Sequence, residues 1–472
     1  MKFLIIFFAA FLFAKEIFFV HMADVHLMND YEIKKIFKGN LSAVNETKKA
    51  VNEIIALKPE LVIQTGDIVG LSDNFYYKRD ENWFKLAQNL IVKPIVNAKI
   101  PFAYVPGNHD ISGVKLKRIN KNDPRFYNGL SFEYIEPLSV NKTKNTFFSY
   151  KKDGYVFIFL DPKETPKSKF RNVILPKNQR EWLKKQISLN KDAFFIISFH
   201  QPLGSWEIES FKEFIKIVEP VKKRTVLLTG HTHDNRIMTY NGIKEYQDGA
   251  ICGDWWKSGK TPNGFPIGYA IYFIKDAKIY RFYRAIDKTD QINLIAPQNT
   301  VLNTPQNVKI NAHFSQNLIN AYYILGNEKH PLKIKKIQTP AFSWYEITGT
   351  ITPKPDGKFH NVRFVFKTAG NTFSKTYLYK FSKNPFFTIQ EIKTKYFKQF
   401  FGREVTVKAT ILKTKKNVVL IGDSSGEIYV WMGDTVHPKL KKGQKIILKA
   451  FVTEFINKKE LKLIKPNDIK VQ

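Results

Sequence analysis

Five short polar runs in the first half of the chain bring together residue types that bind metal ions. The runs are Asp24-Val25-His26, Gly66-Asp67, Gly107-Asn108-His109-Asp110, His200 and Gly230-His231-Thr232-His233. Their carboxylate and amide oxygens and imidazole nitrogens suit Zn, Mn or Fe better than Ca alone. A single aspartate between two nitrogen-rich groups is also what two cations about 3.5 to 4 Å apart need as a bridge. The runs therefore predict a site for two metal ions.

Each polar run follows an apolar segment of strand type. The segments are residues 17–22, 61–64, 102–105, 193–199 and 226–229. Strands buried between helices place their terminal loops on one edge of a sheet, so we expect the five runs to converge. Gly66, Gly107 and Gly230 each precede a donor residue, where the chain turns sharply and its backbone comes close to the ion. A single Asp or His at a strand end is more often a turn former, but the complete set favours a dinuclear site over an accidental or decayed one.

The segments between these strands predict the remaining layers of an α/β domain. Helical spacing of apolar residues occurs over residues 41–57, 81–96 and 179–187, and a hairpin is predicted over 147–161. His21 has the opposite strand parity to Asp24, so we interpret it as structural. Two aromatic loops are harder to interpret from sequence. Residues 72–80 contain Phe75, Tyr76 and Tyr77, and the Gly/Pro-rich stretch 249–269 contains Trp255 and Trp256; either loop could line a substrate cleft or pack on itself.

The five runs resemble the calcineurin-like metallophosphoesterases, whose blocks D-x-H, GD, GNH(D/E), H and GHxH all occur here in order. The resemblance covers roughly residues 17–284 and implies a four-layer α/β/β/α sandwich of two mixed sheets with helices outside. It also implies a dinuclear-metal-dependent phosphoesterase that hydrolyses phosphate mono- or diesters by attack of a metal-bound hydroxide. The two metal ions could be Mn, Zn, Fe or Mg.

The resemblance further implies a role for each polar residue. One metal would be bound by Asp24, His26, Asp67 and His233, and the other by Asp67, Asn108, His200 and His231, with Asp67 as the bridge. His109 would bind no metal and would face the phosphate, and Asp110 would orient or charge its ring.

One branch of the family is disfavoured by two residues. Purple acid phosphatases have a tyrosine in the block GD-x-x-Y, where this chain has Gly70, and their first block is D-x-G, where this chain has His26. We therefore expect no tyrosinate–iron colour.

The second half of the chain predicts two β-domains without a ligand cluster. Short alternating segments from residue 308 to residue 381 predict a small β-sandwich, whose domain we assign to residues 289–384, and residues 286–305 lack periodicity and predict a linker. Five strand-like segments within 385–472 resemble an OB-fold barrel. Tyr429 and Trp431 share one face of its third strand, where OB-folds stack bases. The alternative is that Ile428 and Val430 face outward.

The composition indicates a folded and strongly basic protein. Of 472 residues 43% are hydrophobic, enough for two to four domains. The 75 Lys and Arg against 42 Asp and Glu give a formal charge of +33, which attracts polyanions such as nucleic acid. The alternative is a lysine-rich surface in contact with solvent alone. Cys252 is the only cysteine, so no intrachain disulfide forms.

Residues 1–14 predict a secretory signal, because one Lys is followed by an apolar run that ends in a small residue. The apolar run is too short to span a membrane. We therefore expect an exported protein, periplasmic or extracellular, with a phosphoesterase domain at 15–288. The alternative for residues 3–20 is an extended first strand.

The substrate class stays open at this stage, as does the oligomeric state. A phosphate ester is expected in the metal site, and a polyanion or single-stranded nucleic acid at the OB-fold-like domain. The alternatives are an exported polynucleotide phosphodiesterase that uses this basic domain, and a non-catalytic nucleic-acid-binding protein on a decayed phosphoesterase scaffold.

Overall fold

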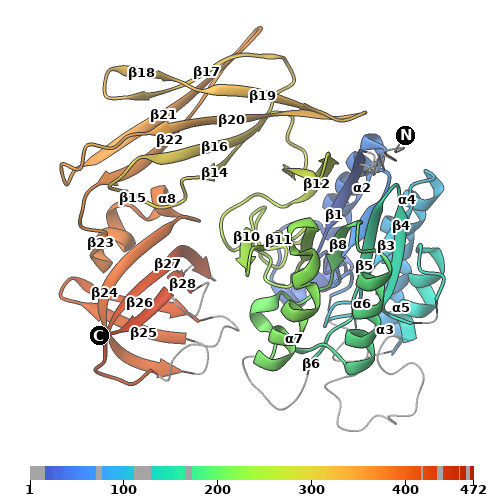
Figure 1. The fold of residues 1–472 in the computed structure, drawn as a ribbon. Coiled ribbons are helices and arrows are strands. Elements are labelled where there is room, and N and C mark those ends of the chain that lie inside the picture. The colour runs from blue at the N-terminus through green and yellow to red at the C-terminus, as the bar shows by residue number, and fades with distance from the viewer. Residues whose placement is uncertain are drawn as a thin grey trace, which may run out of the picture.

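The computed structural model describes residues 16–70, 77–110, 129–143, 145–164, 173–415, 418–432, 440–455, 458–463 and 468–472. The predicted signal at 1–14 and the loop residues Phe75 and Tyr76 lie outside these ranges. Figure 1 shows a helix-covered N-terminal domain, a β-sandwich above and to its left, and a barrel below the sandwich. Among the described residues, no helix is both long and apolar enough to cross a membrane.

Two β-sheets form the centre of the N-terminal domain. The first has the order β13 (Lys278–Ala285), β12 (Gly268–Lys275), β1 (Ile17–Met22), β2 (Val62–Gln64) and β3 (Phe102–Tyr104). The second has the order β10 (Asn235–Tyr240), β11 (Ile243–Asp248), β9 (Thr225–Thr229), β8 (Phe194–Ser198), β5 (Tyr155–Phe159) and β4 (Phe148–Lys152). In the first sheet β1, β2 and β3 are parallel, and the antiparallel strands β12 and β13 extend the sheet beyond β1. In the second sheet the parallel strands β11, β9, β8 and β5 are flanked by the antiparallel strands β10 and β4. The sheets are therefore mixed, as the sequence predicted.

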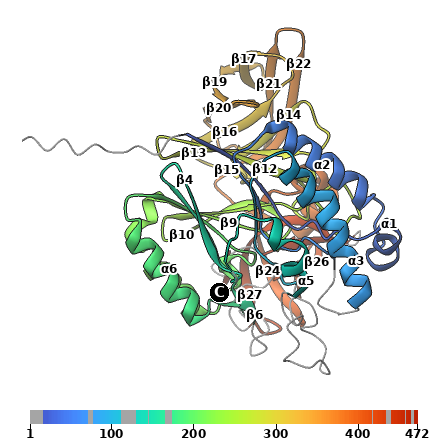
Figure 2. The ribbon, with the colours of Figure 1, turned by 90° about the vertical axis from the view of Figure 1, so that its right-hand side faces the viewer.

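Alternation along the strands creates two apolar faces on each sheet. In β1, Ile17 and Phe19 face the core between the sheets, whereas Phe18 and Val20 face the helices. The first sheet is covered by α2 (Ala43–Leu57) and by the continuous helical segment α3 (Tyr77–Ala87), η3 (Gln88–Val92) and α4 (Lys93–Asn97). The second is covered by α6 (Lys177–Leu189) and α7 (Ile208–Val218). Figure 2 shows α6 and α2 on opposite sides of the sheets, which confirms the predicted four-layer sandwich.

Local signals set the bounds of α2. The side chain of Ser42 accepts a hydrogen bond from the N–H of Asn45, which caps the first turn. Lys58 ends the helix in the left-handed conformation just before Pro59, which cannot continue it. The helix is therefore followed after a short turn by β2, and the predicted bridging residue Asp67 lies just after this strand.

The remaining short elements of this domain connect the layers. They are α1 (Asp30–Glu32), η1 (Ile33–Phe37), α5 (Gly129–Tyr134), η4 (Glu136–Leu138), β6 (Lys163–Glu164), β7 (Val173–Ile174), η5 (Leu203–Ser205) and η6 (Glu219–Arg224). The helix predicted at 81–96 begins earlier, at Tyr77, so part of the predicted loop 72–80 is the first turn of α3.

The middle of the chain forms a sandwich of two sheets around one core. One sheet has the order β14 (Gln291–Ala296), β16 (Gln306–His313), β20 (Ser343–Ile351) and β19 (Lys333–Gln338). The other has the order β15 (Val301–Leu302), β22 (Thr372–Phe381), β21 (Phe359–Thr368), β17 (Leu318–Leu325) and β18 (Glu328–Pro331). The predicted linker at 286–305 is wrong in part, because it contains β14 and β15. These strands are too short for their alternation to stand out in the sequence.

The C-terminal domain is a closed five-stranded barrel. Its strands follow the order β24 (Glu404–Lys415), β25 (Val418–Asp423), β26 (Gly426–Trp431), β28 (Lys458–Lys462) and β27 (Lys445–Phe455), and β27 pairs with β24 to close it. Outside this ring lie β23 (Phe386–Phe387), η7 (Glu391–Lys395), α8 (Phe397–Phe400) and β29 (Ile469–Val471). This barrel confirms the predicted OB-fold-like domain.

The third barrel strand has the orientation predicted from its sequence. Ile428 and Val430 lie in the barrel core, whereas Tyr429 is 42% exposed and Trp431 is half-buried on the opposite face. The alternative, in which Ile428 and Val430 face outward, is therefore wrong. Base stacking on this face stays a prediction.

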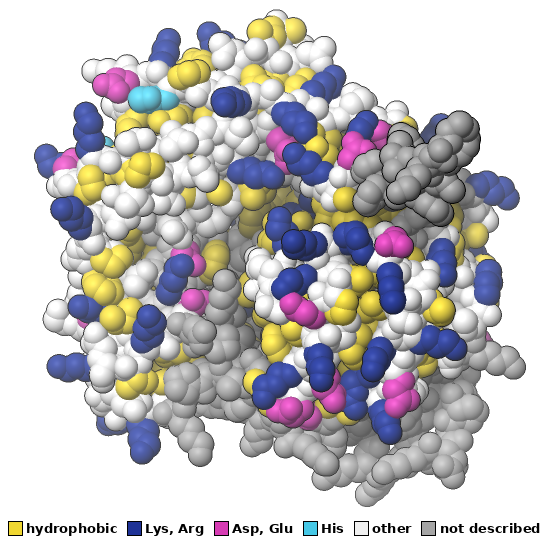
Figure 3. Space-filling model, in the orientation of Figure 1, with side chains coloured by type: hydrophobic (Ala, Val, Ile, Leu, Met, Phe, Trp, Pro, Cys, Tyr) yellow, Lys and Arg dark blue, Asp and Glu magenta, His cyan; other side chains and the backbone are white. Residues whose placement is uncertain are grey.

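Basic side chains are distributed over the whole visible surface. Figure 3 shows Lys and Arg side chains on all three domains, with few acidic groups between them. On this face the basic excess is therefore a general property of the surface, so any specific use of the charge requires a defined site.

A buried ion-pair network joins the two sheets of the N-terminal domain. Asp248 of β11 accepts hydrogen bonds from Arg281 at 2.7 Å and from Tyr272 at 2.6 Å, and it also contacts Nδ1 of His21. The second ring nitrogen of His21 lies 2.8 Å from the hydroxyl of Thr65. Arg281 and His21 hold the pKa of Asp248 below its usual value despite its burial. His21 is therefore a structural residue, as its parity suggested.

Replacing Asp248 with Asn should lower the free energy of unfolding by about 3 to 5 kcal/mol, because Arg281 would stay buried without its counter-charge. Urea unfolding at neutral pH, followed by tryptophan fluorescence, measures this change. Glu209→Gln is the control, since it removes a pair with Lys212 whose side chains are 74% and 63% exposed. The control should change stability by less than about 1 kcal/mol. Equal losses in the two variants would contradict the role of the network.

Candidate metal centre and active site

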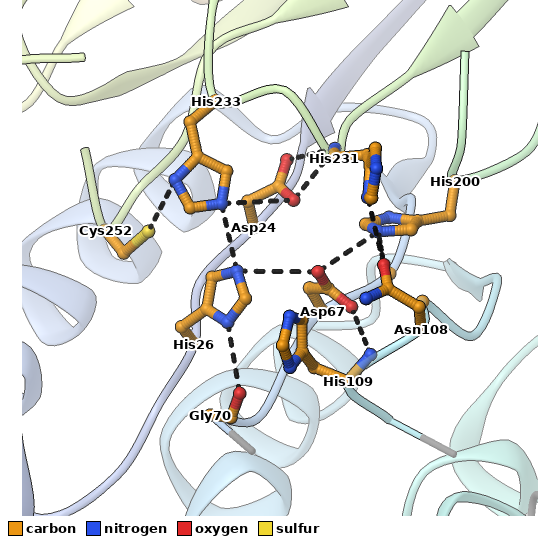
Figure 4. A network of polar contacts seen from close by, with 12 residues as sticks. Asp24, His26, Asp67, Gly70, Asn108, His109, His200, His231, His233 and Cys252 are labelled. Atoms are coloured by element: carbon orange, nitrogen blue, oxygen red, sulfur yellow. Dashed lines mark hydrogen bonds and ion pairs between the residues drawn. The ribbon is translucent and has the colours of Figure 1, made fainter. Parts of the chain in front are cut away.

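The predicted metal ligands lie together at one edge of the two sheets. Figure 4 shows all seven of them, together with His109, around a common centre. They follow β1, β2, β3, β8 and β9, as the sequence predicted. Three groups of ligand atoms, each within 4.8 Å of one another, occur among the described residues: Asp67 with His200 and His231, Asp24 with His26 and Asp67, and His26 with His233 and Cys252.

Backbone carbonyl groups fix the orientation of three histidine rings. Nδ1 of His26 lies 3.3 Å from the carbonyl oxygen of Gly70, Nδ1 of His200 lies 2.7 Å from that of Thr65, and Nδ1 of His233 lies 2.8 Å from that of Gly253. A carbonyl oxygen only accepts, so each Nδ1 carries the proton. Each Nε2 therefore faces the centre of the site, which is the arrangement of metal-binding histidines.

The Nε2 atoms of His26 and His233 lie 3.0 Å apart. Burial lowers the pKa of His26 well below its usual value and that of His233 to about 4, so both rings are neutral at neutral pH. With Nδ1 protonated, the two lone pairs point at each other, and no hydrogen lies between them to join them. A cation that accepts both lone pairs removes this repulsion, so the residues fit a metal ion.

Asp67 lies between the two halves of the site. Its Oδ2 is 3.5 Å from Nε2 of His26 and 3.1 Å from Nε2 of His200, while Oδ1 accepts a hydrogen bond from the backbone N–H of His109 at 2.8 Å. Burial opposes ionisation of Asp67, but the neighbouring histidines, His200 first, hold its pKa well below the usual value. One carboxylate oxygen thus faces both ligand groups, as a bridging ligand requires.

A proton and a cation compete for His200. Burial lowers the pKa of His200, but the charge of Asp67 outweighs this effect and raises it to about 10. Metal binding at Nε2 would therefore release a proton.

The remaining ligand candidates complete the two groups. Oδ1 of Asn108 lies 3.0 Å from Nε2 of His200 and 2.9 Å from Nδ1 of His231. Asp24 accepts hydrogen bonds from the backbone N–H of His231 and lies 3.7 Å from Nε2 of His233. Burial raises the pKa of Asp24 to about 7. Asp24 thus combines with His26 and His233, while Asn108 and His231 combine with His200.

Two glycines allow the close approach that the sequence indicated. A Cβ on Gly107 would lie 2.2 Å from the backbone nitrogen and Oδ1 of Asp67, and a Cβ on Gly230 would lie 2.5 Å from Oδ2 of Asp24. Neither position has room for a side chain while the carboxylates keep their places.

Several ligand residues adopt a backbone conformation that is rare for residues other than glycine. The φ angles are positive at Asp24, His26, Asp67, His231 and His233, between 47° and 68°. Each such residue costs about 1 to 3 kcal/mol, and this cost is tolerated where the surrounding structure fixes the backbone. The turns aim consecutive side chains into one small volume.

His109 and Asp110 have different environments. His109 is half-buried, and its ring contacts that of His26 edge-on at 5.1 Å between centroids. Asp110 is fully buried and accepts hydrogen bonds from the backbone N–H groups of Ile68, Val69 and Gly107. Burial and the charge of Asp67 raise the pKa of Asp110 to about 6. These contacts make Asp110 a clamp between two ligand loops; its predicted action on the His109 ring stays a prediction.

The Gly/Pro-rich stretch at residues 249–269, which we call the tryptophan loop, makes contacts that the sequence did not specify. The ring of Trp255 lies 4.3 Å from that of His26 and 5.6 Å from that of His109, between centroids. The indole N–H of buried Trp256 donates to the backbone carbonyl of His26 at 3.2 Å. Two adjacent tryptophans in a Gly/Pro-rich loop were the sequence signal for a possible role at the site. Only the structure shows that this loop packs against His26 and His109.

Cys252 also lies beside the site. Its Sγ is 3.5 Å from Nδ1 of His233, the nitrogen that faces away from the centre. Burial raises the pKa of the thiol well above its usual value, so the sulfur is a neutral packing group behind the ring. Gly70 contacts the site through its carbonyl group, and the absence of a tyrosinate–iron colour stays a prediction.

Comparison with known proteins agrees with this geometry. The family model described as calcineurin-like phosphoesterase matches residues 19–235. Residues 19–235 are a calcineurin-like phosphoesterase domain. The two sheets extend beyond this match, because β10 to β13 complete them.

The phosphoesterase domain is similar to two named enzymes. A tartrate-resistant acid phosphatase type 5 from Sus scrofa is 26% identical over 223 residues, 42% of this chain and 63% of that protein. A probable cyclic nucleotide phosphodiesterase from Psychrobacter arcticus is 22% identical over 203 residues, 42% of this chain and 64% of that protein. The chain thus spans less than two thirds of the length of either relative.

Solved structures show only distant similarity. A zinc complex of Vps29 from Entamoeba histolytica has 11% identity and a TM-score of 0.26, covering 56% of this chain and 92% of that one. Similarity at this level does not bear on function.

Replacing Gly107 with Ala should weaken metal binding by about 10- to 100-fold, the usual effect of disturbing the support of a ligand. The reason is that the new Cβ would displace Asp67. Metal content by mass spectrometry, after dialysis against buffered metal, measures the loss. The control is Gly259→Ala, since a Cβ at Gly259 meets no atom within 4 Å. Full metal content in Gly107→Ala would contradict the assignment of Asp67 as a bridge.

Proposed function

We propose that this protein is a dinuclear-metal-dependent phosphoesterase that hydrolyses phosphate mono- or diesters. The observation that carries the proposal is the position of Asp67, one of whose carboxylate oxygens faces the Nε2 atoms of both His26 and His200. Asp24, His26, Asp67 and His233 would bind one ion, and Asp67, Asn108, His200 and His231 the other. Mn, Zn, Fe and Mg are the candidates.

Two ions at this site would supply an activated water nucleophile and would neutralise charge on the phosphoryl oxygens. The residues of this chain prepare the site for both tasks. The Nδ1–H groups of His26, His200 and His233 are held by carbonyl oxygens, so the rings need no reorientation when a substrate binds.

His109 is the proposed proton donor to the leaving alkoxide. Its backbone N–H donates to Asp67 at 2.8 Å, and its ring lies beside that of Trp255 in a half-buried position. Histidine is the side chain that most often acts as a general acid or base in catalysis. Asp110 acts through position, because it clamps the backbone of the Asp67 loop to Gly107.

The alternative of a non-catalytic scaffold is less well supported. A decayed site would be expected to have lost ligands or the glycines that admit them. Here all seven ligand candidates converge, and the close contacts at Gly107 and Gly230 are intact. Export of the protein stays a proposal that depends on the predicted signal at residues 1–14.

The relatives leave the ester class open, since one is named a phosphatase and another a probable cyclic nucleotide phosphodiesterase. Turnover of p-nitrophenyl phosphate and bis-p-nitrophenyl phosphate, with each of Mn, Zn, Fe and Mg, tests the proposal. We expect activity that chelation abolishes, that added metal restores, and that Asp67→Asn lacks. No turnover of either ester with any of these metals would overturn the proposal.

Replacing His109 with Gln should lower turnover by about 10²- to 10⁴-fold, the usual contribution of a positioned acid. Bound metal should stay at the wild-type level, because His109 is not a proposed ligand. Steady-state kinetics and metal analysis of the same sample measure both quantities. His360→Gln is the control, since this histidine pairs with Asp356 in the β-sandwich. A variant that lost metal together with activity would show that His109 holds the site instead of donating a proton.

A further inference from the structure

A groove lies between the tryptophan loop and the C-terminal barrel. Its volume is about 1220 Å³, larger than the roughly 300 to 1,000 Å³ of typical small-molecule sites. Three segments line it: residues 36–40, residues 254–262, and barrel residues that include Phe397, Phe401 and Lys459. We call this space the interdomain groove. A small phosphate ester would fill only part of it.

Trp255 links the interdomain groove to the candidate metal centre. Trp255 lines the groove and also packs against His26 and His109. Phe37 continues the wall, with its ring 4.7 Å from that of Trp255 between centroids. A chain-like substrate held at the metals could therefore pass along Trp255 to the groove.

The lining combines positive charge with aromatic rings. It contains five lysines against two carboxylates, Asp254 and Glu454. The lysines are Lys38, Lys257, Lys260, Lys398 and Lys459, and the aromatic residues are Phe37, Trp255, Phe397 and Phe401. Lysines that follow a phosphate backbone and rings that stack on bases are the two components of single-strand binding sites. Charge and rings together favour a nucleic acid over an acidic peptide or an inorganic polyphosphate.

The barrel presents its aromatic face to the same side. Trp431 is in register with Lys462, and Tyr429 with Glu460, on the parallel strands β26 and β28, so these side chains share one face. Nζ of Lys462 lies 2.8 Å from Oδ2 of Asp234, the residue after His233. The face on which OB-folds stack bases is therefore turned towards the phosphoesterase domain. Figure 1 shows the two domains side by side.

A second contact fixes the barrel beside the groove. A Cβ on Gly402 of the barrel would lie 2.2 Å from the carbonyl oxygen of Asn263, and one on Gly264 would lie 2.6 Å from the ring of Phe401. Close packing of this kind leaves little freedom between the loop and the barrel. The groove is thus part of the folded arrangement.

We infer that the interdomain groove binds single-stranded nucleic acid and that the substrate of the metal centre is a phosphodiester within such a strand. This inference rests on the proposed function for its chemistry, but the binding step can be measured without it. Trp255 would then contact the nucleotide next to the scissile phosphate.

Binding is measured on the full chain in EDTA, with a fluorescent single-stranded oligonucleotide of about 16 nucleotides, the upper end of site sizes for one barrel. Fluorescence anisotropy is recorded from about 50 to 200 mM salt, a range in which binding to phosphates weakens steeply. The double variant Lys260→Gln/Lys398→Gln should bind more weakly, with a log–log salt slope shallower by about 1.4, or 0.7 for each phosphate that is no longer neutralised. The control is Lys184→Gln/Lys185→Gln, which makes the same charge change on the exposed face of α6 and should leave the slope unchanged.

A second variant tests the barrel face. Tyr429→Ala should weaken oligonucleotide binding by about 5- to 150-fold, the usual effect of removing an aromatic ring under a base. Turnover of bis-p-nitrophenyl phosphate should be unchanged in Tyr429→Ala and in the groove double variant, because none of these residues touches the metal ligands.

The outcomes separate the two proposals. Absence of oligonucleotide binding by the wild type, or equal slopes in the groove and control variants, would overturn the inference while ester turnover could still support the proposed function. Groove-dependent binding without turnover of any ester would support the inference about binding and overturn the proposed function.

Discussion

The carboxylate of Asp67 lies where the two sheets of the phosphoesterase domain meet. The first sheet supplies Asp24, His26, Asp67 and Asn108, and the second supplies the three remaining histidines. A buried charge is unfavourable unless it is paired, and Asp67 of the first sheet is paired with His200 of the second sheet at 3.1 Å. The sheets must therefore be packed in one relative position for the ligand set to exist.

Two features of the fold secure that position. β2 lies between β1 and β3, and the pairing continues into the ligand loops, where the N–H of Asp24 donates to Gly66 and that of His26 to Asp67. Below the site, His21 and Arg281 meet on Asp248 between the sheets. The apolar core alone could not fix the relative position of the two sheets, since apolar contacts are non-directional. The hydrogen bonds to Asp248 are directional and therefore favour one relative position of the sheets.

Much of the fold and the ligand set could be predicted from the sequence, because both depend on local patterns. The strand that ends at Met22 and the five polar runs are short and contiguous, and the third barrel strand shows strict alternation around Ile428 and Val430. The sequence could not place Trp255 against His26 or Asp110 against Ile68, because such contacts join residues far apart in the chain. It also could not reveal the interdomain groove, whose walls come from three separate segments.

The tryptophan loop contacts both the candidate metal site and the interdomain groove. The carbonyl group of Gly253 fixes the tautomer of His233, Trp256 donates to the backbone of His26, and Trp255 covers the rings of two site histidines. Trp255 and Trp256 both adopt positive φ angles, a conformation that packing on both sides of the loop must maintain. One face of the loop therefore orients ligands, and the other forms the wall of the groove. Because the same backbone serves both faces, we expect a substitution on the groove side of this loop to disturb the support of His26 and His233 as well.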